Sequence, residues 1–410
     1  MICLITPGHV ASTPRLVKNA DALAEAGYRV HVVAGRYFEP ADALDEGILA
    51  AAPWSYSIVD YRSGAGVWLR KFRRQLARRL IRRLTAPGVL TAALAHHGET
   101  QRLARVAAAQ PAQLFLGHCL AGLPAAAFAA ALRGAPCGFD AEDFHDAETG
   151  DREASSDRIA RRILHAKLLP GCTLFTAASP LIARHYAAAY GREPLTLLNV
   201  FPLAHAPVEP LAPRPISTDR PAVLYWFSQT IGPGRGLEAV IRIVGRMHTP
   251  VVLHLRGFVS EDYRRKLQQV ASRERHDPRL TFLPPGQPEE MARLAASADL
   301  GLSTEEKIPP NRDLCLTNKI FVYLLAGLPQ LLSATSAQTA LASELGESAL
   351  LCDLDQPDAP AAQLDAFLSS PARIASARNR AWRLARDRFC WDIEKSVLLD
   401  AVARLHLAAE

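Results

Sequence analysis

The chain has 410 residues, which is too long for one ordinary domain and suits two domains of about 200 residues each. Hydrophobic residues make up 49% of it and the net charge is +6, so the composition is that of a globular protein rather than a disordered one. The seven cysteines are odd in number, scattered and never spaced as CxxC, which excludes a disulfide scaffold and a zinc site of the usual spacing.

No segment resembles a membrane anchor or a secretion signal. No apolar run reaches the roughly 20 residues that span a bilayer. The opening stretch MICLITPGHV is too short for the apolar region of a signal peptide and is broken at Pro7 and Gly8. We therefore expect a cytoplasmic protein, or one that at most lies on a membrane surface, and no metal.

The first half of the chain alternates short apolar strands with amphipathic helices. Residues 2–6 (ICLIT) predict a buried strand, 13–27 a helix that ends in glycine, and 29–34 (RVHVVA) the next strand. This βαβ unit implies a parallel sheet with right-handed crossovers. Further strands are predicted over 112–117, 137–141, 172–177 and 195–200.

A proline-rich stretch then separates two similar halves. Residues 202–221 contain six prolines and no hydrophobic period, which is typical of a linker. Beyond it we predict strands over 222–227, 251–257, 280–284, 300–303, 330–333 and 348–352, alternating with helices, and two helices at the C-terminus. The predicted class is α/β, with two Rossmann-like doubly wound domains facing a cleft, whose ligands bind at the carboxyl ends of the strands.

These patterns give four segments along the chain. We expect an N-terminal, acceptor-side domain over 1–205, a linker over 206–221, a C-terminal ligand-binding domain over 222–385 and a helix over 386–410 that packs across the junction.

A glycine-rich loop follows the first strand of the second half. In SQTIGPGRG, Gly232, Gly234 and Gly236 come after a strand and before a helix, so their backbone can approach a phosphate closely. Arg235 lies within the loop, where a cation can neutralise a diphosphate. The alternative is a plain glycine-rich turn with a solvated arginine.

The segment CLTNKIFVYLLAGLP (315–329) predicts a short, apolar helix with a polar start. Thr317 can cap it through its hydroxyl, and Gly327 ends it. Thr317, Asn318 and Lys319 can offer backbone N–H groups and one cation to a phosphate. The alternative is a well-capped core helix with no ligand.

Several polar residues follow other strands and are further candidates. Glu305 and Glu306 come after the strand at 300–303 and can reach a sugar or ribose hydroxyl, although charged loops are often only solvated. Gly8 and His9 lie in the loop after the first strand, where they can approach a substrate. Asn199 lies at the end of the last strand before the linker.

Two histidines in the first half are candidate catalytic residues. His118 ends a strand, and His145 comes directly after another one. Asp143 and Asp146 flank His145, and a carboxylate can set the tautomer of a histidine. The alternative is that both histidines are structural.

Residues 68–84 (WLRKFRRQLARRLIRRL) predict a basic amphipathic helix. The segment has eight basic residues and no acidic one, and Trp68, Leu69, Phe72, Leu76, Leu80, Ile81 and Leu84 fall near one face. Such a helix suits an anionic membrane surface. No aromatic platform or recognition motif supports nucleic acid as the partner, and the remaining alternative is a solvated helix face.

The order of the motifs resembles a known family. ASPLIARHYAAAYG, LTLLNVFP, GPGRGLEAVI, NKIFVYLLAGLP and RFCWDIEKSVL, taken together over nearly the whole chain, are similar to GT-B glycosyltransferases of glycosyltransferase family 4. The resemblance implies a GT-B fold and transfer of a sugar from a nucleotide-diphosphate donor, usually with retention, without a metal or other cofactor.

The resemblance also implies roles for individual residues. Arg235 would pair with the donor diphosphate, and Lys319 with the Thr317 and Asn318 amides would hold its distal phosphate. The loop at Gly8 and His9 would approach the sugar and the acceptor, and His145 matches a histidine of the family's cleft.

Three positions depart from the family pattern. Val322 and Leu314 stand where the family has glutamates, and Ser228 with Gln229 stands where it commonly has a second cation. We expect a hexosyltransferase acting on a lipid-linked or polysaccharide acceptor in envelope or exopolysaccharide synthesis, at the inner face of the cytoplasmic membrane. A soluble acceptor is one alternative, and a degenerate GT-B paralogue that only binds its ligand is another.

Overall fold

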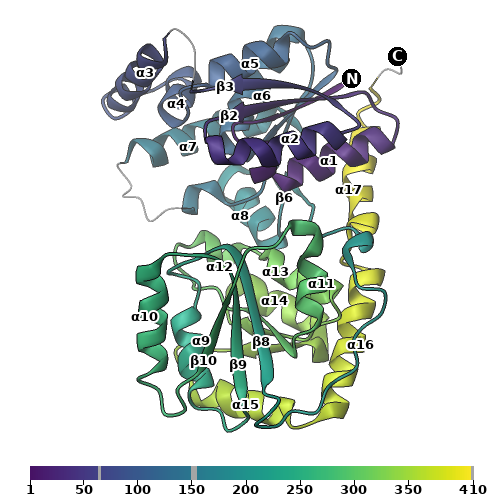
Figure 1. The fold of residues 1–410 in the computed structure, drawn as a ribbon. Helices are drawn as coiled ribbons and strands as arrows, with labels where there is room; N and C mark the ends of the chain where they lie inside the picture. Colours follow the sequence, from purple (N-terminus) through teal and green to yellow (C-terminus); the bar gives the residue numbers. More distant parts are fainter. Residues whose placement is uncertain (63–65, 149–154, 408–410) are drawn as a thin grey trace. The chain divides into compact units, whose positions relative to one another are not determined.

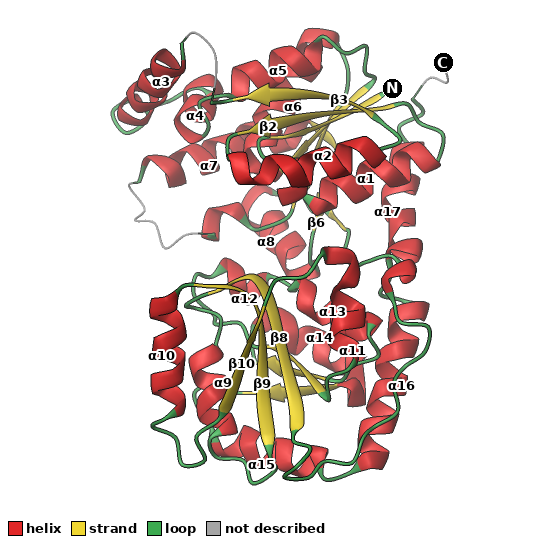
Figure 2. Ribbon diagram, viewed as in Figure 1, coloured by secondary structure: helices red, strands yellow, loops and turns green. Residues whose placement is uncertain are grey.

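The protein forms two compact α/β units in the computed structural model, in which residues 1–62, 66–148 and 155–407 are described (Figures 1 and 2). One unit comprises Met1–Leu197 with Lys395–Glu410, and the other comprises Leu198–Glu394. Each has a parallel sheet covered by helices. This confirms the predicted class, α/β with two doubly wound domains. No helix among the described residues is long and apolar enough to cross a bilayer.

The sheet of the first unit has the order β3-β2-β1-β4-β5-β6-β7, and every neighbouring pair is parallel. Its central strands are buried apolar runs, as is expected when both faces of a sheet are covered. The order reverses between β1 and β4, which is where such sheets bind ligands. The strands are β1 (Ile2–Thr6), β2 (Val30–Arg36), β3 (Ser55–Asp60), β4 (Leu114–His118), β5 (Cys137–Ala141), β6 (Cys172–Ala177) and β7 (Leu195–Thr196).

Local signals in the sequence explain where the helices of this unit begin and end. For α8 (Pro180–Tyr190), the Ser179 hydroxyl accepts a hydrogen bond from the Ile182 N–H at 3.1 Å, and Gly191 ends the helix in the left-handed conformation. In Figure 2, α1 and α2 cover one face of the sheet, and α5 and α6 cover the other. The remaining helices are α1 (Pro14–Glu25), α2 (Asp42–Ala51), α3 (Val67–Leu80), α4 (Val89–His96), α5 (Thr100–Ala108), α6 (Cys119–Arg133) and α7 (Ser156–Leu168).

The sheet of the second unit repeats the same topology, with the order β10-β9-β8-β11-β12-β13. All of its pairs are parallel, and the order reverses between β8 and β11. The strands are β8 (Ala222–Ile231), β9 (Val251–Val259), β10 (Arg279–Leu283), β11 (Leu300–Ser303), β12 (Gln330–Ser333) and β13 (Ala349–Cys352).

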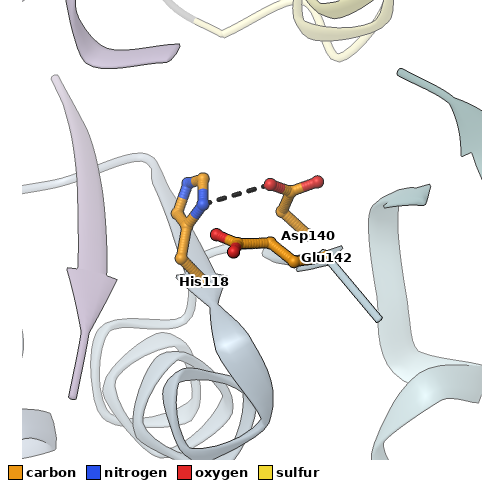
Figure 3. Close-up of side chains that lie close together, drawn as sticks. All are labelled: His118, Asp140 and Glu142. Atoms are coloured by element: carbon orange, nitrogen blue, oxygen red, sulfur yellow. Dashed lines mark ion pairs between the residues drawn. The ribbon is translucent and has the colours of Figure 1, made fainter. Parts of the chain in front are cut away.

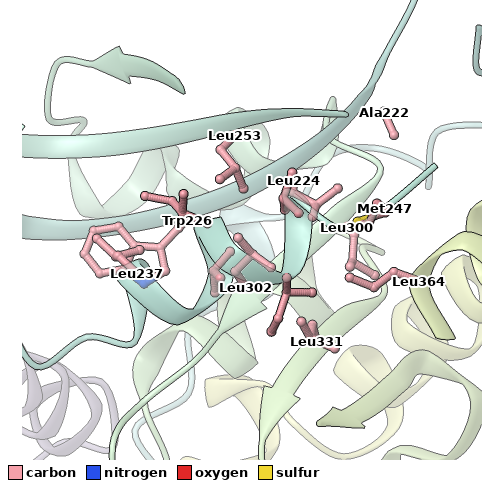
Figure 4. Close-up of a cluster of buried hydrophobic side chains, with 14 of the residues drawn as sticks. Ala222, Leu224, Trp226, Leu237, Met247, Leu253, Leu300, Leu302, Leu331 and Leu364 are labelled. Carbon is pink, nitrogen blue, oxygen red and sulfur yellow. The ribbon is translucent and has the colours of Figure 1, made fainter. Parts of the chain in front are cut away.

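One hydrophobic core holds the second sheet and its helices together (Figure 4). Leu224 and Trp226 of β8 pack in it with Leu302 of β11, and all three are fully buried. Alternation along β8 therefore places Leu224 and Trp226 on the same face, which carries the start of α9 (Leu237–Val244). The other helices of this unit are α10 (Glu261–Ala271), α11 (Met291–Ala296), α12 (Asn311–Leu314), α13 (Asn318–Leu325), α14 (Ser336–Leu345), α15 (Asp358–Leu368) and α16 (Pro371–Asp387). The last helix, α17 (Trp391–Ala403), begins in the second unit and ends in the first.

The proline-rich stretch lies on the second unit. Arg214 donates hydrogen bonds to the Ser297 carbonyl at 2.8 Å and to Asp299 at 3.3 Å, and Arg293 donates one to the Ala204 carbonyl. Apart from a turn at Leu203–His205 it has no regular structure, as its prolines predict.

Three strands differ most from the sequence-based expectation, and the bounds of the others agree with it to within two residues. β3 was not predicted, because most of its side chains are exposed or half-buried and it lacks an apolar run. β7 has two residues rather than six. β8 continues to Ile231, because it pairs with β9 again after an irregularity between Phe227 and Thr230.

The prediction that Thr317 caps α13 through its side chain is wrong. The Thr317 Oγ1 makes no capping bond and lies 3.0 Å from the Ser303 Oγ instead. The helix is also buried on all sides, since every residue from Lys319 to Leu325 is buried.

Candidate functional site

The glycine-rich loop begins where β8 ends and leads into α9. Gly234 and Gly236 both have positive φ, 71° and 68°. A Cβ on Gly236 would lie 2.3 Å from the Thr304 carbonyl oxygen, so only glycine lets the two loops approach this closely. Gly232 has no such restriction, because a Cβ there would meet nothing nearer than 3.9 Å. The glycines therefore bring this loop against the loop that follows β11.

A buried carboxylate joins the two loops to the start of α13. Glu305 is only 3% exposed; its Oε1 lies 2.6 Å from the Lys319 Nζ, and its Oε2 lies 3.7 Å from Arg235 Nη1. Burial by itself raises the pKa of Glu305, but Lys319, Arg235 and Arg312 hold the pKa below its ordinary value. Two cations separated by 84 residues in the chain thus converge on one charged carboxylate.

Two further residues at this place were missed by the sequence analysis. Arg312 donates a hydrogen bond from Nη1 to the Gly234 carbonyl, so it adds a third cation next to the glycine-rich loop. The ring of Trp226 lies under Lys319, with Nζ 5.3 Å from the ring centroid. The face of an indole ring attracts a cation, so Trp226 helps to hold the ammonium group in place. Only the position of Trp226, near the end of a strand, could have indicated its role.

The polar start of α13 lies close to the end of the segment after β7. Asn318 is exposed, and its Oδ1 accepts a hydrogen bond from Asn199 Nδ2 at 2.9 Å. The first N–H groups of a helix have no partner within it, so Asn318 and Lys319 present donors at this end. We call the set of Gly234, Arg235, Glu305, Arg312, Asn318 and Lys319 the anion site.

Glu306 does not join the anion site. It is exposed and lines a hollow of about 790 Å³ together with Gly234, Gly236 and the helices α9 and α10. Arg235 and Lys319 do not line this hollow, so the anion site is defined by its converging charges and not by the hollow.

The carboxyl ends of β4 and β5 carry a buried charge cluster in the first unit (Figure 3). Arg15 of α1 donates to both oxygens of Asp140, at 2.6 and 2.8 Å, and to the Leu197 carbonyl. His118 Nδ1 lies 3.1 Å from Asp140 Oδ2, and the Thr176 hydroxyl donates to the other oxygen. Burial alone would raise the pKa of Asp140, but Arg15 and His118 lower it strongly, so the carboxylate is charged.

Glu142 lies beside this cluster with different electrostatics. Burial and the charge of Asp140 raise the pKa of Glu142 above its ordinary value. His118, Asp140 and Glu142 each have a potential ligand atom within 4.8 Å of the others. Because Arg15 and Thr176 already occupy both oxygens of Asp140, the cluster is better suited to hydrogen bonding than to holding a cation.

The loop after β1 is held by its own histidine. His9 is 1% exposed; its Nδ1 lies 2.6 Å from Asp45 Oδ2, and its Nε2 accepts from the Tyr37 and Phe38 N–H groups. Two accepted bonds at Nε2 place the ring proton on Nδ1, where it donates to Asp45. The ring is therefore engaged within the protein, and a substrate near Gly8 and His9 would meet their backbone.

His145 is buried at 3% exposure in a network of aromatic and charged groups. Glu148, and not Asp143 or Asp146 as we expected, is its ion-pair partner, with Oε1 3.1 Å from Nδ1. Asp146 pairs at 3.0 Å with His165 of α7 instead, and the His165 ring stacks on the His145 ring with 6.1 Å between centroids. Burial lowers the pKa of His145, but Glu148 and other nearby carboxylates raise it above the ordinary value.

The two positions where a glutamate was expected are closed to solvent. Val322 is 2% exposed and Leu314 is 6% exposed. A glutamate at either position would therefore be buried in this structure.

Of the comparisons with known proteins, the one with solved structures found similar proteins. No protein-family model matches the sequence, and no curated protein matches it by sequence. Among solved structures, Anabaena Alr3699/HepE in complex with UDP and glucose is similar over 98% of this chain and 100% of its own, with 16% identity and a TM-score of 0.70. Sucrose-phosphate synthase from Thermosynechococcus elongatus is similar over 100% of both chains, with 14% identity and a TM-score of 0.68.

A third neighbour is the lipopolysaccharide outer core galactosyltransferase WaaB in its apo form. It covers 98% of this chain and 99% of its own, at 12% identity and a TM-score of 0.62. Together with the two repeated parallel sheets, these likenesses show that the chain has the GT-B fold.

Proposed function

We propose that this chain is a metal-independent glycosyltransferase that uses a nucleotide-diphosphate sugar as donor. The donor's diphosphate binds at the anion site, with Arg235 and Lys319 as its cations and the start of α13 as its backbone donors. The structural neighbours include one in complex with UDP and glucose, which supports a nucleotide sugar as the donor class.

The convergence of Arg235 and Lys319 on buried Glu305 carries this proposal. It lies at the carboxyl ends of β8 and β11, where the strand order reverses and where sheets of this type bind nucleotides. Cations held in place by a buried carboxylate are already oriented for a diphosphate, so binding requires little reorganisation. Arg312 provides a third positive charge beside the loop.

The charge cluster of the first unit serves the sugar and the acceptor in this proposal. His118 and Glu142 would hydrogen-bond hydroxyl groups, because a carboxyl with a raised pKa can both donate and accept. Asp140 and Arg15 would keep His118 oriented. His145 would act in the same region, and the leaving phosphate would assist a transfer with retention.

The finer parts of the proposal concern the acceptor and the location. We propose a lipid-linked or polysaccharide acceptor in envelope or exopolysaccharide synthesis, at the inner face of the cytoplasmic membrane. A product released into the aqueous phase when the enzyme is given a soluble saccharide would favour a soluble acceptor instead.

Calorimetric and thermal-shift titration with UDP, GDP, ADP and TDP tests donor binding. One diphosphate is expected to raise the unfolding midpoint, since a ligand at a hundredfold excess over its Kd stabilises by about 2.7 kcal/mol. Arg235→Ala and Lys319→Met should lose this shift relative to their own unliganded midpoints. Arg383→Ala, at an exposed position in α16, is the control and should keep it.

Turnover separates an enzyme from a degenerate binding protein. Binding of a diphosphate without hydrolysis or transfer of any sugar conjugate would favour the binding protein. Val322 and Leu314 are the reason to consider it, because they stand where the family pattern has glutamates and are buried. Absence of binding by every diphosphate would contradict the proposal. A chelator should leave turnover unchanged, and the anomeric configuration of the product, compared by NMR with that of the donor, tests retention.

A further inference from the structure

The helix α3 exposes a row of large apolar side chains. Trp68 is 75% exposed and Phe72 51% exposed, and their rings stack at 5.7 Å. Leu76 and Leu80 continue the row at four-residue spacing, and Leu84 follows in the turn after α3, where its N–H donates to the Leu80 carbonyl at 2.9 Å; all three are exposed. Residues four apart lie on one side of a helix, so these side chains form one stripe, with Leu69 beside it. Monomeric proteins rarely expose such a patch without a partner.

The opposite side of α3 is fixed to the rest of the first unit. Arg70 pairs with Glu99 at 2.7 Å, Arg74 donates to the His96 carbonyl at 3.0 Å, and Arg78 pairs with Asp157. These arginines are also four residues apart. Ala77 and Ile81 are buried between α3 and its neighbours, of which α4 is seen beside it in Figure 1.

The orientation of the helix therefore corrects one point of the sequence analysis. Ile81 does not lie on the apolar stripe but points inward at 2% exposure. Three of the arginines hold the helix in place, so its outward face is apolar rather than basic. The stripe does not pack against the rest of the first unit, because the opposite side of α3 makes those contacts.

Cations flank the stripe on its exposed sides. Lys71, Arg79, Arg82 and Arg83 are exposed, and none of them has an ion-pair partner among the described residues. Arg73 is exposed as well and donates only to the Gln101 side chain. No acidic residue occurs between positions 67 and 84, so nothing within the segment neutralises these charges.

We infer that α3 and the turn after it dock the protein on an anionic lipid bilayer, with Trp68, Phe72, Leu76 and Leu80 of the helix and Leu84 of the turn inserted between the lipids. The 14-residue helix is about 21 Å long and would lie parallel to the surface. Apolar side chains then enter the boundary of headgroups and acyl chains, while flanking cations contact lipid phosphates. A protein partner would need acidic groups matched to these cations, whereas an anionic bilayer supplies negative charge at every position.

This inference uses the proposed function in one respect, since a lipid-linked acceptor requires access to a membrane. The vesicle measurements below need no donor or acceptor. If docking fails while a diphosphate still binds at the anion site, this inference and the proposed membrane location are overturned, and the proposed donor class stands.

Flotation with vesicles tests the inference. Pure phosphatidylcholine vesicles are compared with vesicles of equal parts phosphatidylcholine and phosphatidylglycerol. The wild type should float with the anionic vesicles and much less with the neutral ones. The variant Trp68→Ser/Phe72→Ser/Leu76→Ser removes three apolar insertions, and Lys71→Gln/Arg79→Gln/Arg82→Gln/Arg83→Gln removes four outward cations. Each should bind at least about tenfold more weakly.

Two controls separate docking from misfolding and from general stickiness. Leu132→Ser removes an apolar side chain of α6 that is 69% exposed, and it should bind like the wild type. Both multiple variants should keep the diphosphate-induced thermal shift of the wild type. The fluorescence of Trp68, isolated by comparison with Trp68→Phe, should shift to shorter wavelength on anionic vesicles.

Three results would overturn the inference. One is a wild type that does not bind anionic vesicles, and another is binding that the triple serine variant retains. The third is a concentration-dependent dimer without vesicle binding, which the triple serine variant abolishes. In that case the stripe would be an interface between two copies of this chain.

Discussion

Lys319 Nζ and Glu305 Oε1 lie 2.6 Å apart, and both side chains are less than 10% exposed. Such a buried pair contributes little net stability, because the attraction between the charges only offsets their desolvation. The pair instead fixes the positions of its two side chains. Glu305 follows β11 and Lys319 lies in the first turn of α13, and the Ser333 hydroxyl donates a hydrogen bond of 2.7 Å to the Glu305 carbonyl. The proposed phosphate cation is thus held in one place before any ligand arrives.

Removing the cation from this pair should destabilise the protein. Lys319→Met keeps the length of the side chain but leaves Glu305 buried with Arg235, at 3.7 Å, as its remaining ion-pair partner. We expect a loss of about 3–5 kcal/mol in the free energy of unfolding, which is typical for an orphaned buried charge. Urea unfolding followed by tryptophan fluorescence measures it.

Two further variants control this experiment. Glu305→Gln/Lys319→Met should recover much of the loss, because no buried charge is left. Lys266→Met breaks the more exposed pair with Glu238 and should cost about 0–1 kcal/mol. Equal losses for Lys319→Met and Lys266→Met would contradict the buried-pair interpretation.

Neutralising Glu305 should strengthen the binding of a diphosphate. Glu305→Gln leaves Lys319 an oxygen to donate to, but it removes the negative charge that competes with the ligand for Lys319 and Arg235. We expect Kd to fall about tenfold, equivalent to about 1.4 kcal/mol. Calorimetric titration of the diphosphate found in the screen measures this change.

The salt dependence of binding provides the check on that prediction. The increase in diphosphate affinity caused by Glu305→Gln should shrink as ionic strength rises, because it is electrostatic and salt screens it. Glu306→Gln is the matched control, since Glu306 is exposed and lies outside the anion site. A weaker affinity for Glu305→Gln would mean that Glu305 contacts the ligand itself.

Most of the fold was predictable, because buried parallel strands are continuous apolar runs. β1, β5, β6, β11 and β12 have the bounds that their apolar letters predict. The edge strand β3 was missed since Ser55 and Tyr56 are exposed and the segment has no apolar run. The end of β8 was missed because Ser228 and Gln229 are polar and lie in an irregularity, after which Thr230 and Ile231 pair with β9 again.

The candidate site was predictable in its positions but not in its pairings. Arg235 and Lys319 were identified by local signals, a glycine-rich loop and the start of a helix. That Glu305 rather than Glu306 joins them depends on how the loop after β11 folds, which no local pattern reveals. Asp140 gave one unused signal: a charged residue inside a buried strand requires a partner, and Arg15 is that partner across 125 residues.

His145 and Glu148 should make stability depend on pH in a defined window. The folded pKa of His145 lies above its ordinary value near 6.5, so the stability due to its protonated form is fully present below about pH 6.5 and is lost as pH rises through the folded pKa. The pKa of Glu148 is lowered: burial raises it, and His145 outweighs that effect. Its contribution is present above about pH 4.5 and is lost as pH falls.

Thermal midpoints measured from about pH 5 to about pH 9 test this window. The difference in thermal midpoint between the wild type and His145→Gln should shrink as the pH rises above about 6.5. The difference between the wild type and Glu148→Gln should follow the same trend. Differences are needed because His165 next to His145 has a lowered pKa and contributes in the opposite direction. His185→Gln, at an exposed position, should give a small difference. A difference for His145→Gln that grows with pH would contradict the ion pair.

Gly236 and Gly232 provide a matched test of the glycine-rich loop. Gly236→Ala would place a Cβ 2.3 Å from the Thr304 carbonyl oxygen at a φ of 68°, so the two loops must separate. We expect a loss of about 1–3 kcal/mol in the free energy of unfolding, and weaker diphosphate binding beyond what the loss of stability explains. Arg235, which precedes Gly236 in the loop, would move away from Glu305.

Gly232→Ala is the same chemical change four residues earlier, where the new Cβ meets nothing nearer than 3.9 Å. It should change stability by less than about 1 kcal/mol in either direction, because an unstrained alanine mainly reduces the entropy of the unfolded chain. Unfolding and calorimetric titration of both variants side by side measure the contrast. Equal effects of Gly236→Ala and Gly232→Ala on diphosphate binding would contradict this role of Gly236. The contact between the glycine-rich loop and the loop after β11 would then not position Arg235, and binding would depend on Lys319 and the start of α13.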